Sequence, residues 1–228
     1  DDSVCRVVMN EVTVMRSARG YSPYSVYLNE PLPSIMAVGG HLKNTVSISK
    51  GNYIHTSQHL GDLESLEAYQ EFRTEIKSLK TLFNSHPELI SCDKHPAYLS
   101  TQFAETENLP VIPVQHHYAH VLSCMAENSI DQPVLGVCWD GTGYGDDSTI
   151  WGGEFLNVSN SCYKRAAHMK TFSLPGGDNS IKEPRLALLG LLYEIFGKNL
   201  FNMTYLSPIK TFSNEELKIL DTALSNKI

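Results

Sequence analysis

Two histidines in the segment QHHYAH, residues 115 to 120, are placed to bind one metal ion. His116 and His120 are four residues apart. If the segment is helical, both imidazoles project from the same face at about the spacing that a single ion requires. The alternative is that they are ordinary core or surface histidines. If they bind a metal, the pair gives two neutral nitrogen ligands, and the spacing alone leaves both alternatives open.

A second candidate follows about twenty residues later, in WDGTGYG at 139 to 145. Asp140 introduces three glycines, Gly141, Gly143 and Gly145, and a glycine-rich turn can wrap backbone N–H groups around phosphate oxygens while a carboxylate faces a cation. An Asp-Gly pair also makes a plain hairpin turn, in which the aspartate only caps its own backbone. We predict that metal and nucleotide meet in one cleft here.

The elements that must position these residues follow from hydrophobic periodicity. Residues 4–15 alternate like one strand, and residues 23–33, with three prolines, are typical of a linker. Between 34 and 130 the pattern predicts the order βββαβαβα, including a helix over 62–83 with Asp62 as its N-cap and a helix over 116–129. Strands are expected at 134–139 and 149–158 around a turn at 140–148, and a helical stretch at about 181–197.

Composition excludes several classes of protein. The chain has 228 residues, 42% of them hydrophobic, and a net charge of −7, which leaves no broad basic face for nucleic acid. Five cysteines without a CxxC pair fit a reducing cytoplasm. No apolar run is long enough to span a membrane, so we expect no membrane association. The chain starts without Met, and we expect it to be a piece of a longer protein.

Several motifs, in this order, resemble the HypF-type carbamoyltransferases of [NiFe]-hydrogenase maturation. They are DDSV at 1, RGYSP at 19, LKNT at 42, SQHLGDLE at 57, DKHPAYLST at 93, QHHYAH at 115, WDGTGYG at 139, WGGEF at 151 and LPGGD at 174. The resemblance covers nearly the whole chain, and the motifs are long and keep their order. RSARGY, His41 and Arg185 differ from the residues that are usual at these positions in the family, so the family's contacts at these three places do not carry over directly.

The resemblance implies an α/β fold of the actin-like ATPase superfamily, in which two ribonuclease-H-like lobes clamp a nucleotide. In that scheme residues 1–22 are the C-terminal tail of a YrdC-like domain and 23–33 a linker. Residues 34–130 are the complete first lobe with the HxxxH metal motif. Residues 131–228 are a partial second lobe with the phosphate and adenylate loop and a helical segment.

The resemblance also implies a reaction. Carbamoyl phosphate and ATP would give carbamoyladenylate, whose carbamoyl group passes to the C-terminal cysteine of the acceptor protein HypE and becomes a cyanide ligand of the hydrogenase. A divalent metal, iron or zinc, would assist, and Mg²⁺ is a further candidate. The enzyme would be cytoplasmic, and we expect this chain alone to be inactive because the remaining half of the cleft is missing.

Residue roles carry over motif by motif. The metal ligands would be His116, His120 and Asp140, and His117 between them would either support a ligand from behind or face solvent. Phosphate and adenylate contacts would come from Asp140, Gly141, Thr142, Gly143, Tyr144, Gly152, Gly153 and Glu154. Catalytic or substrate-pocket roles would fall to Lys43, His59, Asp62 and His95. The plainer alternatives are that Lys43 is a solvated loop lysine and that Asp62 and His95 are helix caps. For Gly152 and Gly153 the alternative is a bulge in a strand.

Three other functions compete with this assignment. An O-carbamoyltransferase acting on a small-molecule hydroxyl would share HxxxH and similar loops. The tRNA threonylcarbamoyl-transfer family is opposed by the acidic composition and by the motif wording. A non-catalytic metal- and nucleotide-binding module is the alternative from a different class, because the chain holds only part of the expected cleft.

Overall fold

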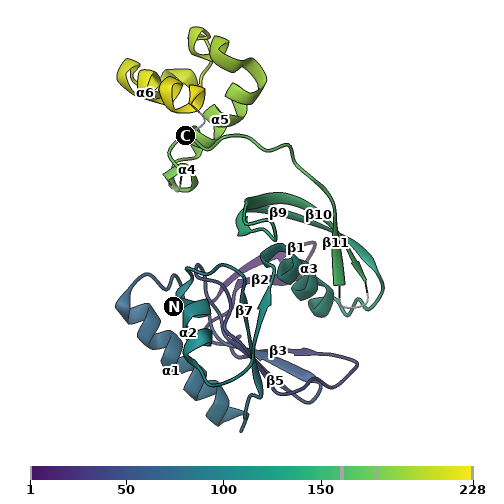
Figure 1. The fold of residues 1–228 in the computed structure, drawn as a ribbon. Coiled ribbons are helices and arrows are strands. Elements are labelled where there is room, and N and C mark those ends of the chain that lie inside the picture. Colours follow the sequence, from purple (N-terminus) through teal and green to yellow (C-terminus); the bar gives the residue numbers. More distant parts are fainter. Residues whose placement is uncertain (1, 160–161, 178, 227–228) are drawn as a thin grey trace. The chain divides into compact units, whose positions relative to one another are not determined.

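The computed structural model describes residues 2–159, 162–177 and 179–226, so Asp178 of the LPGGD motif lies outside the described residues. The chain divides into two compact units, residues 1–168 and 169–228 (Figure 1). The strands that follow residue 130 group with the first unit, together with the HxxxH segment. The lobe boundary expected at residue 130 stays a prediction.

The N-terminal residues form a hairpin rather than the single strand expected over 4–15. Strand β1 (Val4–Val8) pairs antiparallel with β2 (Glu11–Arg16). The turn between them consists of Met9 and Asn10, both with positive φ. Two successive positive φ angles are typical of tight hairpin turns, but such turns usually contain glycine. Without a glycine, the sequence carried no clear sign of this turn.

A six-stranded mixed sheet dominates the first unit, in the order β3-β6-β5-β4-β7-β8. The strands β4 (Ile35–Ala37), β5 (Ser47–Lys50) and β6 (Tyr53–Thr56) form the expected antiparallel meander. Strands β7 (Leu89–Asp93) and β8 (Val111–Val114) continue it in parallel. Strand β3 (Tyr24–Tyr27) was not expected, because it lies in the predicted linker. Its aromatic and β-branched residues pair along the sheet edge between the prolines.

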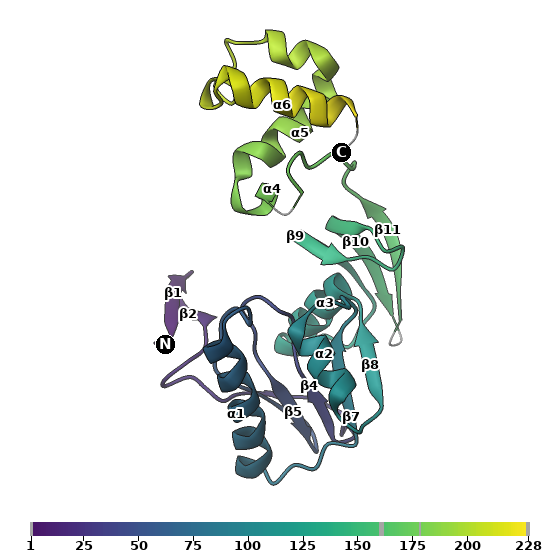
Figure 2. The same ribbon diagram turned by 60° about the vertical axis from the view of Figure 1, so that its left-hand side comes forward.

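Helices α1 (Leu66–Leu82) and α2 (Leu99–Thr106) lie alongside this sheet (Figure 2). One apolar core joins them to the strands, with Phe72 and Phe103 packed against Met36, Ile48 and Ile90. Helix α1 begins later than predicted.

Asp62 is not the N-cap of α1. Ser65 takes that position, and its hydroxyl accepts a hydrogen bond from the N–H of Ala68. The carboxylate of Asp62 instead accepts the N–H of Lys43, 2.9 Å away. Three residues, 63–65, therefore separate Asp62 from the helix.

Helix α3 (His116–Glu127) packs on a separate three-stranded antiparallel sheet of order β11-β10-β9. Strand β9 (Val134–Tyr144) runs through Asp140 and the glycines, and β10 (Ile150–Ser159) and β11 (Cys162–His168) follow. The turn expected at 140–148 is therefore confined to residues 145–149. The glycine-bearing stretch is extended strand.

The second unit is helical. It contains α4 (Asn179–Lys182), α5 (Pro184–Phe196), the 3₁₀ segments η1 (Gly197–Asn202) and η2 (Ile209–Thr211), and α6 (Asn214–Ser225). Its core is formed by Leu189, Leu200, Ile209, Phe212 and Leu224. Helix α5 confirms the helical stretch expected near 181–197. In the described part of both units, no helix has the length and apolar character needed to cross a membrane.

Candidate metal centre

His116 and His120 lie in the first two turns of α3, and their rings come together as their spacing predicted. Their Nε2 atoms are 3.2 Å apart. Gln115 caps the helix, because its side-chain oxygen accepts the N–H of Tyr118 at 2.8 Å. The cap starts α3 at His116 and so places both imidazoles at its N-terminal end, beside the sheet.

Asp140 brings the third ligand atom from β9. Its Oδ2 lies 3.0 Å from Nε2 of His116 and 3.7 Å from Nε2 of His120. One donor atom from each of these residues lies within 4.8 Å of the other two. Oδ2 is buried and receives no hydrogen bond of normal geometry from any described residue. Three donor atoms that converge without satisfying one another form the kind of set that binds a divalent cation.

The charges in this cluster shift the pKa values of its members. The carboxylates of Asp140, 3.0 Å from Nε2, and of Asp93, 2.7 Å from Nδ1, raise the pKa of His116 to about 9. Burial alone would raise the pKa of Asp140, but the neighbouring His116 and His120 rings hold the pKa of that carboxyl well below its usual range. The metal-free cluster therefore holds a carboxylate and a protonated imidazole at neutral pH. A bound cation would take the place of the proton on Nε2 of His116.

Asp93 supports this cluster from behind, and the sequence reasoning missed it. Its Oδ2 lies 2.7 Å from Nδ1 of His116, and its side chain is buried. Its other oxygen accepts the N–H of His95 at 2.8 Å. A carboxylate on Nδ1 fixes the ring and leaves the Nε2 lone pair for a metal, as is common for metal-bound histidines. One signal was available in the sequence. Asp93 and His116 each come soon after a short apolar segment, at 89–92 and 109–114, that is typical of a buried strand.

The predicted phosphate residues 141–144 lie in a strand, and close packing explains one of the glycines. A Cβ on Gly143 would lie 2.5 Å from Cε1 of His117 and 3.0 Å from Cβ of His116. Helix α3 thus approaches β9 so closely that a side chain does not fit at this position. Gly141 differs, because a Cβ there would meet nothing within 4 Å. Thr142 lies between these two glycines, and Gly141 is the position where a ligand could approach the backbone.

Gly152, Gly153 and Glu154 lie on β10, where Gly153 pairs with Trp139 and Glu154 with Cys138. The pairing register shifts between Trp151 and Gly153, because the single residue Gly152 faces residues 140–142 of β9, so the extra residues of this bulge lie on β9. The carboxylate of Glu154 is buried and forms two hydrogen bonds with Arg165, at 2.6 and 2.8 Å. It also accepts the N–H of Gly152 at 3.2 Å. These contacts use Glu154 to hold the sheet together, and its predicted contact with a nucleotide stays a prediction.

Lys43, His59 and Asp62 lie on two adjoining loops. Besides the bond from Lys43 to Asp62, the N–H of Asn44 donates to the carbonyl of Gly61 at 2.8 Å. Lys43 has a positive φ of 50°, uncommon for a residue with a side chain. Such backbone often occurs at functional sites. The structure brings these three predicted residues together, apart from the histidine–aspartate cluster.

His95 stands between those loops and the cluster. Its ring stacks on Tyr98 with centroids 4.1 Å apart, and it meets the edge of Tyr144 at 5.3 Å. On its other side Tyr98 stacks on His41, at 5.5 Å. This row of four rings runs from the loop of Lys43 to β9. Neither His41 nor Tyr98 was singled out from the sequence as a site residue.

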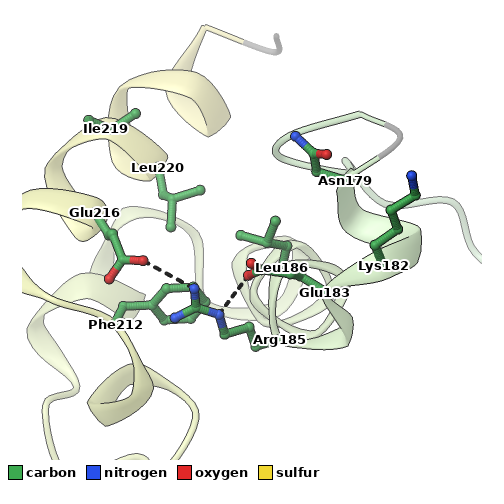
Figure 3. A pocket seen from close by; sticks show the side chains of 9 residues that line it. All are labelled: Asn179, Lys182, Glu183, Arg185, Leu186, Phe212, Glu216, Ile219 and Leu220. Carbon is green, nitrogen blue, oxygen red and sulfur yellow. Dashed lines mark hydrogen bonds and ion pairs between the residues drawn. The ribbon is translucent and has the colours of Figure 1, made fainter.

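A hollow in the second unit contains none of the predicted site residues (Figure 3). The guanidinium of Arg185 lies over the ring of Phe212 and bonds to Glu183, to Glu216 and to the carbonyl of Thr211. With its donors satisfied in this way, Arg185 connects α5 to α6. Among the described residues that line the hollow, there is no group of metal-binding side chains like that of His116, His120 and Asp140.

Comparison with known proteins identifies the family. Residues 30–127 match the model described as HypF Kae1-like domain, and residues 136–228 match that of the carbamoyltransferase Kae1-like domain, second subdomain. The curated carbamoyltransferase HypF of Synechocystis is 46% identical over 94% of this chain, and that of Rhizobium leguminosarum is 40% identical over 81%. The chain spans only 28% and 24% of the length of these two relatives.

Solved structures agree with this match. A crystal structure of full-length HypF in the phosphate- and nucleotide-bound form superposes with a TM-score of 0.89 at 39% identity, over all of this chain and 30% of that one. The structure of T. kodakarensis HypF gives 0.84 at 30% identity, over 99% of this chain and 31% of that one. The mixed α/β fold of this chain is therefore that of HypF structures. The chain belongs to the HypF carbamoyltransferase family and corresponds to a part of its longer members.

Proposed function

We propose that this chain carries the metal centre at which a HypF-type enzyme transfers a carbamoyl group from carbamoyladenylate to a cysteine thiolate. The observation that carries the proposal is the convergence of His116, His120 and Asp140 on one point, with Asp93 behind His116. Relatives named carbamoyltransferase and a solved relative in a phosphate- and nucleotide-bound form support it.

The donor set suits iron or zinc. Two imidazole nitrogens and one carboxylate oxygen match the preferences of these ions, and three protein ligands leave a position for a substrate oxygen. When bound, such an ion supplies a positive charge that polarises a carbamoyl or phosphate oxygen. Mg²⁺ is also possible as a companion of ATP phosphates.

The residues around the centre have distinct tasks. The open backbone at Gly141 is where we place the adenylate phosphate, and Thr142 and Tyr144 flank it on β9. The ammonium group of Lys43 would offset its negative charge. The row of rings that includes His95 would form one wall of the substrate pocket.

Transfer would proceed by attack of the thiolate on the carbamoyl carbon. A carbon–sulfur bond forms, the bond from that carbon to the adenylate phosphate oxygen breaks, and AMP leaves with the electron pair. The thiol proton is lost before attack. Positive charge and backbone N–H groups near Asp140 would stabilise the oxygen that becomes negative.

The architecture that we propose is actin-like, with ribonuclease-H-like lobes. The six-stranded sheet with α1 and α2 would be the first lobe, and β9 to β11 would begin the second. In support, each lobe opens with a strand, a glycine-bearing segment and an antiparallel strand. Because the chain spans under a third of its relatives, we expect it not to complete the reaction alone.

The acceptor that we propose is the C-terminal cysteine of a HypE-type protein. The test uses the full-length protein and two assays. Exchange of labelled pyrophosphate into ATP, dependent on carbamoyl phosphate, reports formation of carbamoyladenylate. Carbamoylation of a HypE-type C-terminal cysteine, followed by mass spectrometry, reports transfer.

We expect His116→Ala to abolish transfer and to leave the exchange intact, because adenylate formation belongs to the YrdC-like domain. Transfer at the wild-type rate by His116→Ala would contradict the proposal. Carbamoylation of a small-molecule hydroxyl instead of the cysteine would favour the O-carbamoyltransferase function. ATP binding without exchange or transfer would favour a binding module.

A further inference from the structure

We propose that His117 is a positioning residue, which donates a hydrogen bond from Nε2–H to the carboxylate of Asp140 and does not bind the metal. The inference rests on the proposed metal centre. His117 is the middle histidine of QHHYAH and is fully buried. Its ring packs against β9, where a Cβ on Gly143 would lie 2.5 Å from Cε1.

The side chain of Gln115 determines which nitrogen of His117 carries the proton. Its Oε1 accepts the N–H of Tyr118 at 2.8 Å, and its Nε2 donates to the carbonyl of Tyr144 at 3.2 Å. Both partners are backbone groups with a fixed role, so the amide can have only this orientation. The same Nε2 lies 3.2 Å from Nδ1 of His117. An amide nitrogen is a donor only, so Nδ1 of His117 must be the acceptor.

It follows that the proton of the neutral ring sits on Nε2. The ring is fully buried, and burial favours the neutral form of an imidazole. His117 is thus the reverse of His116, whose Nδ1 faces the carboxylate of Asp93. His116 can offer an Nε2 lone pair to a metal, and His117 offers an Nε2–H instead.

That N–H faces a carboxylate that has room for another donor. Nε2 of His117 and Oδ2 of Asp140 are 3.8 Å apart and both are buried. Among the described residues Nε2 of His117 has no hydrogen-bond partner, and Oδ2 has only the nearby Nε2 of His116, 3.0 Å away and without the geometry of a normal hydrogen bond. Leaving a buried donor or acceptor unpaired costs about 1–3 kcal/mol. A small rotation of the Asp140 carboxylate would satisfy both. Metal-binding carboxylates are commonly held by such hydrogen bonds.

The ring is held in place from the other side. The missing side chain at Gly143 leaves the space that the His117 ring occupies, as the 2.5 Å approach to Cε1 shows. The thiol of Cys138 donates to the carbonyl of His117 at 3.3 Å. Glu154 is the other acidic group near this ring, and Arg165 already pairs with it. Asp140 is therefore the acceptor that the Nε2–H of His117 can reach.

Two substitutions separate the nitrogens of His117. The amide of asparagine occupies about the position of Nδ1, and the amide of glutamine about that of Nε2. His117→Asn can still accept from Gln115 but loses the donor toward Asp140, whereas His117→Gln can present an N–H at that point. We expect His117→Asn to bind Zn²⁺ about 10–100-fold more weakly than wild type. His117→Gln should recover most of the affinity.

The experiment measures Zn²⁺ affinity of the 228-residue chain by competition with a chelator, and the tautomer by long-range ¹⁵N–¹H NMR of the metal-free wild type. An Nε2–H signal for His117, with affinity in the order wild type, Gln, Asn, is the expected result. An Nδ1–H tautomer, or equal affinity of wild type and His117→Asn, would overturn the inference. If the wild type binds no Zn²⁺, the metal centre itself is wrong. The NMR measurement needs no variant, so misfolding of a mutant does not affect it.

Discussion

Asp93 and His116 are joined by a 2.7 Å contact between Oδ2 and Nδ1, across the ends of two neighbouring parallel strands. Asp93 is the last residue of β7, and β8 leads directly into α3. The carboxylate sets both the orientation and the tautomer of the imidazole. The candidate metal centre is therefore positioned by the sheet as well as by the helix that carries the histidines.

Replacing Asp93 should weaken metal binding while every proposed ligand is retained. Asp93 accepts two N–H groups, from His116 and His95, and an asparagine can accept only one of them with its single oxygen. We expect Asp93→Asn to lower Zn²⁺ affinity about 10-fold or more. Glu105→Gln, an exposed change on α2, is the matched control. Unchanged affinity in Asp93→Asn by chelator competition would refute the supporting role.

Gly143 and Gly141 should respond differently to alanine. At Gly143 the added Cβ would lie 2.5 Å from His117, whereas at Gly141 it meets open space. Overpacking of this kind costs about 1–3 kcal/mol. Gly143→Ala should lower the free energy of unfolding measured with urea by that amount, and Gly141→Ala should change it little. Equal effects of the two substitutions would mean that α3 and β9 are not packed as described.

Stability of the metal-free chain should fall as the pH rises toward alkaline values. In the folded state the pKa of His116 is raised to about 9 from 6.5. The folded chain therefore holds this proton more tightly, so the stabilisation is complete below about pH 6.5 and is lost as the pH rises through 9. Urea midpoints measured with chelator present should drop across this range. His116→Gln should show a smaller drop, and an identical profile would contradict the assignment.

Substitutions in the ion pair of Glu154 and Arg165 test whether Glu154 has a structural role or makes the nucleotide contact predicted from the sequence. Arg165 also stacks over Trp151, with its guanidinium carbon 3.9 Å from the ring centroid. Arg165→Met leaves a buried carboxylate unpaired, and we expect a loss of about 3–5 kcal/mol in the free energy of unfolding. Glu154→Gln combined with Arg165→Met should recover part of it. A large loss of nucleotide affinity in Glu154→Gln, with stability unchanged, would favour the original prediction.

The local parts of this structure could be predicted from the sequence, and the parts that depend on distant packing could not. His116 and His120 lie in one helix, so their spacing alone predicts a shared face. The meander and α1 follow from periodicity in the same way. Asp93 is 23 residues before His116, and only the pairing of β7 with β8 brings them together.

The glycines of β9 show the opposite error. Gly141, Gly143 and Gly145 were interpreted as a turn because glycine is common in turns. In the structure, Gly143 lies in β9 and allows α3 to approach. Gly145 does lie in the turn, where its carbonyl accepts the N–H of Ser148 at 3.0 Å, and it also makes room for Trp151, whose Nε1 would lie 2.1 Å from a Cβ there. Close packing and a turn give the same signal in sequence. Only the position of α3 tells the two apart.

The most direct test of the central claim is the metal content of the purified chain, measured by inductively coupled plasma mass spectrometry after reconstitution with Zn²⁺ or Fe²⁺ and removal of free ions. If His116, His120 and Asp140 form the centre, the wild type should retain one ion per chain. His120→Ala should retain far less, and an exposed histidine variant such as His86→Ala should match the wild type. Equal metal content in wild type and His120→Ala would contradict the account.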